Sequence, residues 1–253
     1  MSKFLEKVEV IFIILSLIVF FSFLISTYYP QLIKLAPISY VIAEIISSLL
    51  AVITFSFVDR NWRGWLGWFF IVLGIAFFII GDIIWFYYPI FLSQEAPFPG
   101  IAELFYVLFY VPIVIALVYF IKWINVALSS TEKFLIAIIA VILLIGVMYV
   151  GVVPTFFDKE QTFLEKFLNS FYILGDFVLL TLSLILTIQL WGGIRAQNLI
   201  FFVIGASLHS LGDIIFSYLF KAYGLTNLVD VMFVACILFI SYSVIRESRL
   251  HIK

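Results

Sequence analysis

The sequence predicts an all-α integral membrane protein with eight transmembrane helices, and three observations predict it. Of the 253 residues, 65% are hydrophobic and 11% are charged, whereas soluble domains carry about 25% charged residues. A soluble fold of this size has too little interior to hide so much apolar surface. Apolar runs of about 20 residues, the length that crosses a bilayer, also recur along the chain. The formal net charge of −1 argues against a nucleic-acid partner. Membrane lipids are the expected partners, because the chain is expected to lie in the bilayer.

Eight apolar runs are long enough to cross a bilayer. The segments between them contain Pro, Gly or charged residues, which are typical of connections between helices. No hydrophilic stretch is long enough to form a soluble domain. The expected spans are residues 10–29, 38–58, 65–88, 100–120, 134–153, 167–190, 198–220 and 225–245.

The distribution of Lys and Arg predicts that both termini are cytoplasmic, because loops on that side carry an excess of positive charge. With this orientation, the inside segments hold Lys3, Lys7, Arg60, Arg63, Lys122, Lys133, Arg195, Arg246, Arg249 and Lys253. The outside segments hold only Lys34, Lys159, Lys166 and Lys221. The expected location is therefore the cell membrane, with the chain passing through it several times.

The motif GDII occurs twice, at residues 81–84 and 212–215, and predicts an internal duplication. Residues 75–88 align with 206–219, residues 39–55 with 171–187, and residues 101–117 with 228–244. The expected repeats are residues 1–124 and 132–253, with four helices each. Because four is an even number, both repeats have the same orientation, and a pseudo-two-fold axis is expected along the membrane normal.

Six acidic residues fall inside the expected spans and form three pairs at equivalent repeat positions. The pairs are Glu44 with Asp176, Asp82 with Asp213, and Glu103 with Asp230. With the predicted orientation, all six belong to the outer half of the membrane. A carboxylate at the bilayer centre costs at least about 2.5–3.5 kcal/mol, so these side chains are expected to face the bundle interior or a cavity. We expect an outward-facing acidic pocket that also includes His209, Tyr106, Tyr110 and Trp85.

Less specific roles remain open for each of these residues. A repeated carboxylate can clamp neighbouring helices, and Glu103 and Asp230 can stabilise helix N-termini. His209 precedes Asp213 by four residues, so the pair can relay protons, bind a metal or only pack. Trp85 can line the pocket or anchor the membrane interface. The sequence has no nucleotide, zinc-protease or serine-hydrolase motif, and neither a metal nor another cofactor is expected.

The segment from Asp82 to Tyr110 resembles the multispanning input domains that precede histidine kinase and GGDEF modules in archaea and bacteria. Those domains carry an Asp near a helix end, a Pro-containing loop, and then Ala-Asp/Glu-x-Phe-Tyr-x-x-x-Tyr. Here the corresponding residues are Asp82, Pro97, Pro99, Ala102, Glu103, Phe105, Tyr106 and Tyr110. The resemblance implies a sensor, and because no output domain follows residue 245, a separate signalling partner is expected.

Two Gly-Asp motifs also resemble those of the eight-span lysoplasmalogenase family, which hydrolyses vinyl-ether lysolipids. Gly81-Asp82 fits the motif of an early helix, and residues 205–213 partly fit a later Gly-Ala-x-x-Phe-x-x-Ser-Asp pattern. His209 stands there in place of Phe, and Gly212 in place of Ser. This resemblance implies that Asp82 and Asp213 are catalytic, one as a general acid and one activating water.

Three functions therefore follow as hypotheses. The first is a sensor or receptor-like protein whose pocket binds a small molecule, a lipid headgroup or a cation. The second is a membrane-embedded ether-lipid hydrolase, and the third is a proton- or cation-coupled transporter. The transporter is disfavoured because the inner half of the expected spans offers no comparable polar residues.

Overall fold

The computed structural model describes residues 2–190, 196–219 and 228–252, and the side chains in these ranges except those of 2–6, 196–197 and 217–219. Its regular structure is helical, apart from one isolated bridge between Val58 and Ile252. Within these residues, eight helical segments are long and apolar enough to cross a membrane. The prediction of a multi-pass, all-helical membrane protein is therefore confirmed.

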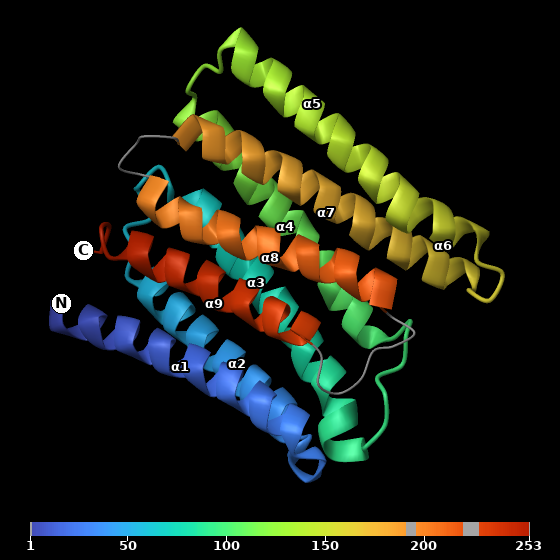
Figure 1. The fold of residues 1–253 in the computed structure, drawn as a ribbon. Helices are drawn as coiled ribbons and strands as arrows, with labels where there is room; N and C mark the ends of the chain where they lie inside the picture. Colours follow the sequence, from blue (N-terminus) through green and yellow to red (C-terminus); the bar gives the residue numbers. More distant parts are fainter. Residues whose placement is uncertain (1, 191–195, 220–227, 253) are drawn as a thin grey trace.

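The main helices follow the predicted spans closely (Figure 1). A π-helical turn, Tyr88–Leu92, extends α3, and another, Met148–Val152, joins α5 to α6 so that they form one span, Ser130–Phe157. That span begins four residues before the expected position 134. The helices are α1 (Ser2–Tyr28), α2 (Leu35–Ser56), α3 (Trp65–Tyr87), α4 (Ile101–Ile124), α5 (Ser130–Val147), α6 (Val153–Phe157), α7 (Phe163–Leu190), α8 (Ala196–Leu219) and α9 (Leu228–Ser248).

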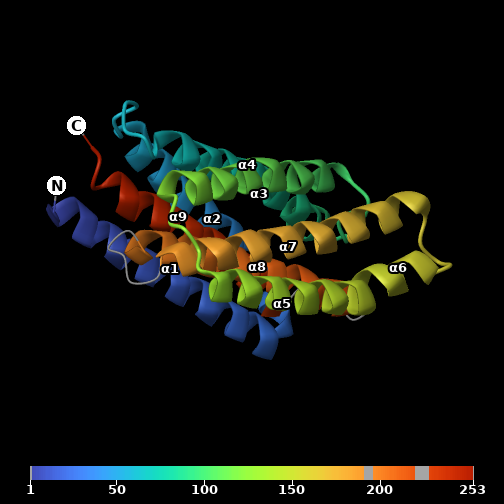
Figure 2. The ribbon, with the colours of Figure 1, turned by 90° about the horizontal axis from the view of Figure 1, so that it is seen from above.

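The helices form one bundle in which sequence neighbours pack as antiparallel pairs (Figures 1 and 2). The most extensive contacts join α3 to α4 and α8 to α9. Further contacts join α2 to α9 and α4 to α7, while α1 lies beside α2 and α5 beside α7. Both chain termini lie at the same end of the bundle (Figure 1).

Glycines allow close approach in both of the tightest helix pairs. A Cβ atom added at Gly74 in α3 would lie 2.6 Å from Ile113 Cδ1 in α4. A Cβ atom added at Gly205 in α8 would lie 2.6 Å from Ile240 Cγ1 and 2.8 Å from the Cys236 carbonyl oxygen in α9. Small residues at such crossings let two backbones approach closely inside a membrane bundle.

Apolar side chains both fill the bundle and cover its outside. Trp68, Phe109, Phe120 and Phe202 are fully buried, whereas α5 exposes large apolar side chains, including Phe134 at 65%. In water this exposed apolar surface would be unfavourable, but hydrocarbon solvates it as well as a protein interior does.

The end of the bundle near the termini also contains a buried polar pair. Helix α9 continues past the expected boundary at residue 245 to Ser248, and this extension buries Glu247. Asn198 Nδ2 donates a hydrogen bond of 2.7 Å to Glu247 Oε2. The expectation that acidic residues are confined to the opposite half of the spans is therefore wrong, because α9 is longer than its apolar run.

Candidate functional site

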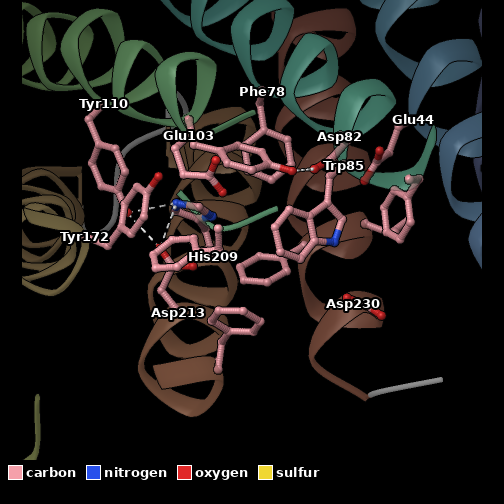
Figure 3. Close-up of a pocket in the computed structure, with 16 residues that line it drawn as sticks. Glu44, Phe78, Asp82, Trp85, Glu103, Tyr110, Tyr172, His209, Asp213 and Asp230 are labelled. Atoms are coloured by element: carbon pink, nitrogen blue, oxygen red, sulfur yellow. Dashed lines mark hydrogen bonds and ion pairs between the residues drawn. The ribbon is translucent and has the colours of Figure 1, made fainter. Parts of the chain in front are cut away.

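A cavity lies at the end of the bundle opposite the termini, where α3 ends and α4 and α9 begin. Its volume, counted as the space that the centre of a water molecule can occupy, is about 90 Å³, several times the roughly 10–15 Å³ that one water molecule needs. Five of the six predicted acidic residues line it (Figure 3). The lining residues are Glu44, Phe78, Asp82, Trp85, Phe86, Phe98, Glu103, Tyr106, Tyr110, Tyr172, His209, Asp213, Phe216, Asp230, Phe233 and Val234.

One side of the cavity carries Glu44 of α2 together with Asp82 and Tyr106, which we call the Asp82 cluster. The Tyr106 hydroxyl donates a hydrogen bond of 2.6 Å to Asp82 Oδ1. Asp82 and Glu44 are electrostatic neighbours, and Figure 3 shows their carboxylates side by side. The two carboxyl groups are close enough to share a hydrogen bond with each other. Beyond that pair, both oxygens of Glu44 and Oδ2 of Asp82 are buried without a hydrogen-bond donor among the described residues.

The other side carries Tyr110, Asp176, His209 and Asp213, which we call the Asp213 cluster. The Tyr110 hydroxyl lies 2.9 Å from Asp176 Oδ1 and 2.8 Å from Asp213 Oδ2, so its single proton bonds one of these carboxylates or is shared between both. His209 Nε2 lies 3.2 Å from the same hydroxyl and 3.6 Å from Asp213 Oδ2. Tyr110 of α4 therefore links α7 and α8 through one buried hydroxyl group.

The Asp213 cluster contains a set of residue types that can bind a metal. One ligand atom each from Asp176, His209 and Asp213 lies within 4.8 Å of the others. The Tyr110 hydroxyl bridges both carboxylates at this point. Asp176 Oδ2 and His209 Nδ1 remain buried without a described hydrogen-bond partner, so the network satisfies only part of the cluster.

Glu103 serves the helix on which it lies. It is the third residue of α4, and the Gly100 N–H donates a hydrogen bond of 2.6 Å to Glu103 Oε2. Asp230 is likewise the third residue of α9. The helix dipole favours a carboxylate at this position, so the N-terminal role weighed for both residues agrees with their positions.

The cavity brings together most of the predicted pocket residues. Glu44, Asp82, Trp85, Glu103, Tyr106, Tyr110, His209, Asp213 and Asp230 all line it, while Asp176 is fully buried behind Tyr110. Trp85 therefore faces the cavity rather than serving only as an interface anchor. The functional role of these residues stays a prediction.

Sequence reasoning did not select most of the aromatic lining. Phe78, Phe86, Phe98, Phe216 and Phe233 line the cavity, but the chain has 30 Phe residues, and many of them face outward. The predicted repeat alignment gives one signal that could have identified two of these phenylalanines. Phe78 aligns with His209, and Phe233 aligns with Tyr106, so each aligns with a residue that was selected.

Chemically, the cavity combines acidic groups with aromatic surfaces. Of the described residues that line it, none is Lys or Arg, and His209 is the sole member that can carry a positive charge. Such a site favours a positively charged group and disfavours an anion. It also contains the aspartates of the two GDII motifs, Asp82 and Asp213, which are electrostatic neighbours.

Compared with protein-family models, with curated proteins and with solved structures, the chain has no significant match.

Proposed function

We propose that this membrane protein is receptor-like and binds a small molecule in the acidic cavity. The observation that carries the proposal is the state of Glu44. Its side chain is 1% exposed and lines the cavity, and apart from the neighbouring Asp82 carboxyl group neither of its oxygens has a hydrogen-bond partner among the described residues. A buried polar group without a partner costs about 1–3 kcal/mol, and more if it is charged. A ligand that supplies donors would remove this cost.

The helix arrangement supports the proposed duplication. Contacts of α3 with α4 and of α8 with α9 are equivalent under the repeat alignment, and so are those of α2 with α9 and α7 with α4. The glycine contacts follow the same relation, because Gly74 faces Ile113 and Gly205 faces Ile240, which are aligned positions. The proposed pseudo-two-fold axis would relate residues 1–124 to residues 132–253 and pass between the two clusters.

We further propose that both termini are cytoplasmic and that the cavity faces the outside of the cell membrane. The cavity lies at the end opposite the termini, and the excess of positive charge supports this orientation. Signalling would then pass to a separate partner. The proposed orientation is tested by labelling intact cells with a membrane-impermeant maleimide.

Two introduced cysteines report on the two ends of the bundle. Gln94 is exposed in the connection beside the cavity, and Ala127 is exposed in the connection at the opposite end. In a Cys236→Ala background, which removes the single native cysteine, we expect Gln94→Cys to be labelled in intact cells. Ala127→Cys should be labelled only after the membrane is opened. The reverse pattern would place the cavity on the cytoplasmic side.

The binding function is tested by analysing what the protein retains when it is purified from membranes. We expect mass spectrometry to detect a small molecule that is enriched with the unmutated protein and lost from Glu44→Gln and Asp82→Asn. The Glu132→Gln variant is the matched control, because Glu132 lies at the start of α5, away from the cavity. Equal retention by all four proteins would contradict binding in the cavity.

A membrane-embedded lipid hydrolase is the second candidate. One observation favours it: Asp82 and Asp213, the aligned aspartates, line the same cavity. One carboxylic acid could protonate a vinyl ether while the other activates water. Incubation with ether lipids should then yield a product with the unmutated protein and none with Asp82→Asn or Asp213→Asn. Proton- or cation-coupled transport is less supported, because the described cavity lies at one end of the bundle only.

A further inference from the structure

We propose that the ligand is a protonated primary amine attached to an apolar body of about the size of an aromatic ring. Its ammonium group would lie between Glu44 and Asp82, and its apolar body would lie against the aromatic side chains of the cavity. This inference rests on the proposed binding function and names the chemical class that the cavity recognises.

The charge of the lining selects a cation. Five carboxylic acids face the cavity, and no Lys or Arg side chain does so among the described lining residues. An anionic ligand would lack a charged partner and would be repelled by the carboxylates. Phosphate-bearing headgroups and free carboxylic acids are therefore disfavoured.

Unpartnered oxygens place the positive group at the Asp82 cluster. Glu44 and Asp82 are 1% and 5% exposed. Together they present three oxygens without a described donor from outside the pair: Glu44 Oε1, Glu44 Oε2 and Asp82 Oδ2. A primary ammonium group has three N–H donors and no acceptor, so it can donate to each of these oxygens. Hydrogen bonds between charged partners are also the strongest class in proteins.

The Asp213 cluster is less suited to the ammonium group. The Tyr110 hydroxyl already bridges Asp176 and Asp213, and His209 lies beside the same hydroxyl. The one buried carboxylate oxygen of this cluster without a described donor, Asp176 Oδ2, belongs to a residue that does not line the cavity, so a ligand would have to break the Tyr110 bonds to reach it. The ammonium group is therefore expected on the Asp82 side of the cavity.

Aromatic rings select an organic cation rather than a metal ion. Phe78, Trp85, Phe86 and Phe233 line the cavity, and the centre of the Phe78 ring lies 5.5 Å from that of Tyr106 in the Asp82 cluster. Ring faces attract organic cations and provide apolar contact for a carbon body. Calcium and magnesium instead require six or more oxygen ligands, which these rings cannot supply. A quaternary ammonium could also make cation–π contacts with the rings, but it has no N–H group that could donate a hydrogen bond to the three oxygens.

The test compares four probes that share one aromatic body and differ in the head group. Phenethylamine, phenethyl alcohol, phenethyltrimethylammonium and hydrocinnamate are titrated into the full chain in lipid nanodiscs, and binding heat is recorded. We expect phenethylamine to bind at least about tenfold more tightly than the alcohol, because it gains charged hydrogen bonds. The trimethylammonium probe should fall between these two, and hydrocinnamate should not bind measurably.

Variants locate the ammonium group. Glu44→Gln and Asp82→Asn should each weaken phenethylamine binding by about tenfold or more while changing the affinity for the alcohol little. Glu132→Gln is again the matched control and should bind like the unmutated protein. Circular dichroism and thermal unfolding of each variant check that it is folded. If either Glu44→Gln or Asp82→Asn does not fold, the affinity of the other variant for phenethylamine is sufficient for the test.

The outcomes separate this inference from the proposed function. Equal affinity for the amine and the alcohol, or preference for hydrocinnamate, would overturn the amine inference and leave a binding cavity. The amine inference would also be overturned if none of the four probes bound, while the purified protein retained a different molecule that Glu44→Gln and Asp82→Asn lost. The cavity would then still be a binding site. If no probe binds and no molecule is retained, both proposals fail.

Discussion

The two sides of the cavity start from equivalent residues and end with different partners. Asp82 and Asp213 are aligned in the two GDII motifs, as are Glu44 and Asp176. In the Asp82 cluster one tyrosine bonds one aspartate, and three carboxylate oxygens are left without a described donor from outside the pair of Glu44 and Asp82. In the Asp213 cluster one tyrosine bonds two aspartates and contacts a histidine. We call the first cluster open, because its three unpartnered oxygens belong to residues that line the cavity. We call the second closed, because its one buried unpartnered carboxylate oxygen, Asp176 Oδ2, belongs to a residue that does not.

The difference arises from two aligned positions. Tyr106 donates to Asp82, but its counterpart in α9 is Phe233, which has no hydroxyl group. The second aspartate pair instead receives its donor from Tyr110, across the contact between α4 and α7. His209 replaces Phe78 at the remaining position and adds a polar ring. In the proposed function, the Asp213 cluster stabilises the bundle while the Asp82 cluster binds the ligand.

The largest effect is expected at the glycines of the two tight helix pairs. Gly205→Ala should lower the free energy of unfolding by about 3 kcal/mol, and Gly74→Ala by about 1–2 kcal/mol. A Cβ atom at Gly205 would meet the Cys236 carbonyl oxygen at 2.8 Å, and backbone cannot easily move aside. At Gly74 the nearest atoms belong to the Ile113 side chain, which can rotate. Unfolding of the purified protein in detergent measures both, and equal losses would contradict this distinction.

The tyrosines test the contrast between the closed and open clusters. Tyr110→Phe should lower the free energy of unfolding by about 2–3 kcal/mol, because two buried carboxylates lose their shared donor. Tyr106→Phe removes the donor to one carboxylate and should cost about 1 kcal/mol. Thermal unfolding under the same conditions compares them. A larger loss for Tyr106→Phe would show that the Asp82 cluster is the more important for stability.

The acidic residues should respond with opposite signs. Glu44→Gln is expected to raise the stability of the ligand-free protein by about 1 kcal/mol, because a neutral amide relieves repulsion from Asp82 and can donate to it. Asp213→Asn should lower stability by a similar amount, because Tyr110 and His209 lose a charged partner. Chemical denaturation of both variants provides the measurement. If Glu44→Gln and Asp213→Asn lowered the free energy of unfolding equally, the distinction between an open and a closed cluster would be contradicted.

The smallest expected effect concerns the histidine. His209→Phe places at this position the residue found at its aligned counterpart, Phe78. It removes the contact of Nε2 with the Tyr110 hydroxyl but keeps the ring contacts with Phe78 and Phe109. We expect a loss of about 0.5–1 kcal/mol in unfolding free energy and unchanged binding of the ligand. Loss of ligand binding would instead assign His209 to the binding site.

The sequence alone was sufficient for the membrane class, the eight spans and the inward position of the acidic residues. Each span must cross an apolar layer of fixed thickness, so its length and composition are visible in the chain. A carboxylate in hydrocarbon is costly, so Glu44, Asp82 and Asp176 had to be buried in the bundle whatever their neighbours were. The boundary of α9 was predicted less well, because Glu247 is polar but buried.

Only the tertiary structure decided which partner each carboxylate meets. In helices that are apolar on all sides, periodicity does not show which face points inward or which helix lies opposite. The pairing of Tyr110 with Asp176 and Asp213 depends on the contact between α4 and α7, which joins the proposed repeats. The aromatic lining depends on the same packing, since Phe78 and Phe233 resemble the lipid-facing phenylalanines in sequence. Three-dimensional packing thus turned two similar acidic pairs into one closed network and one open site.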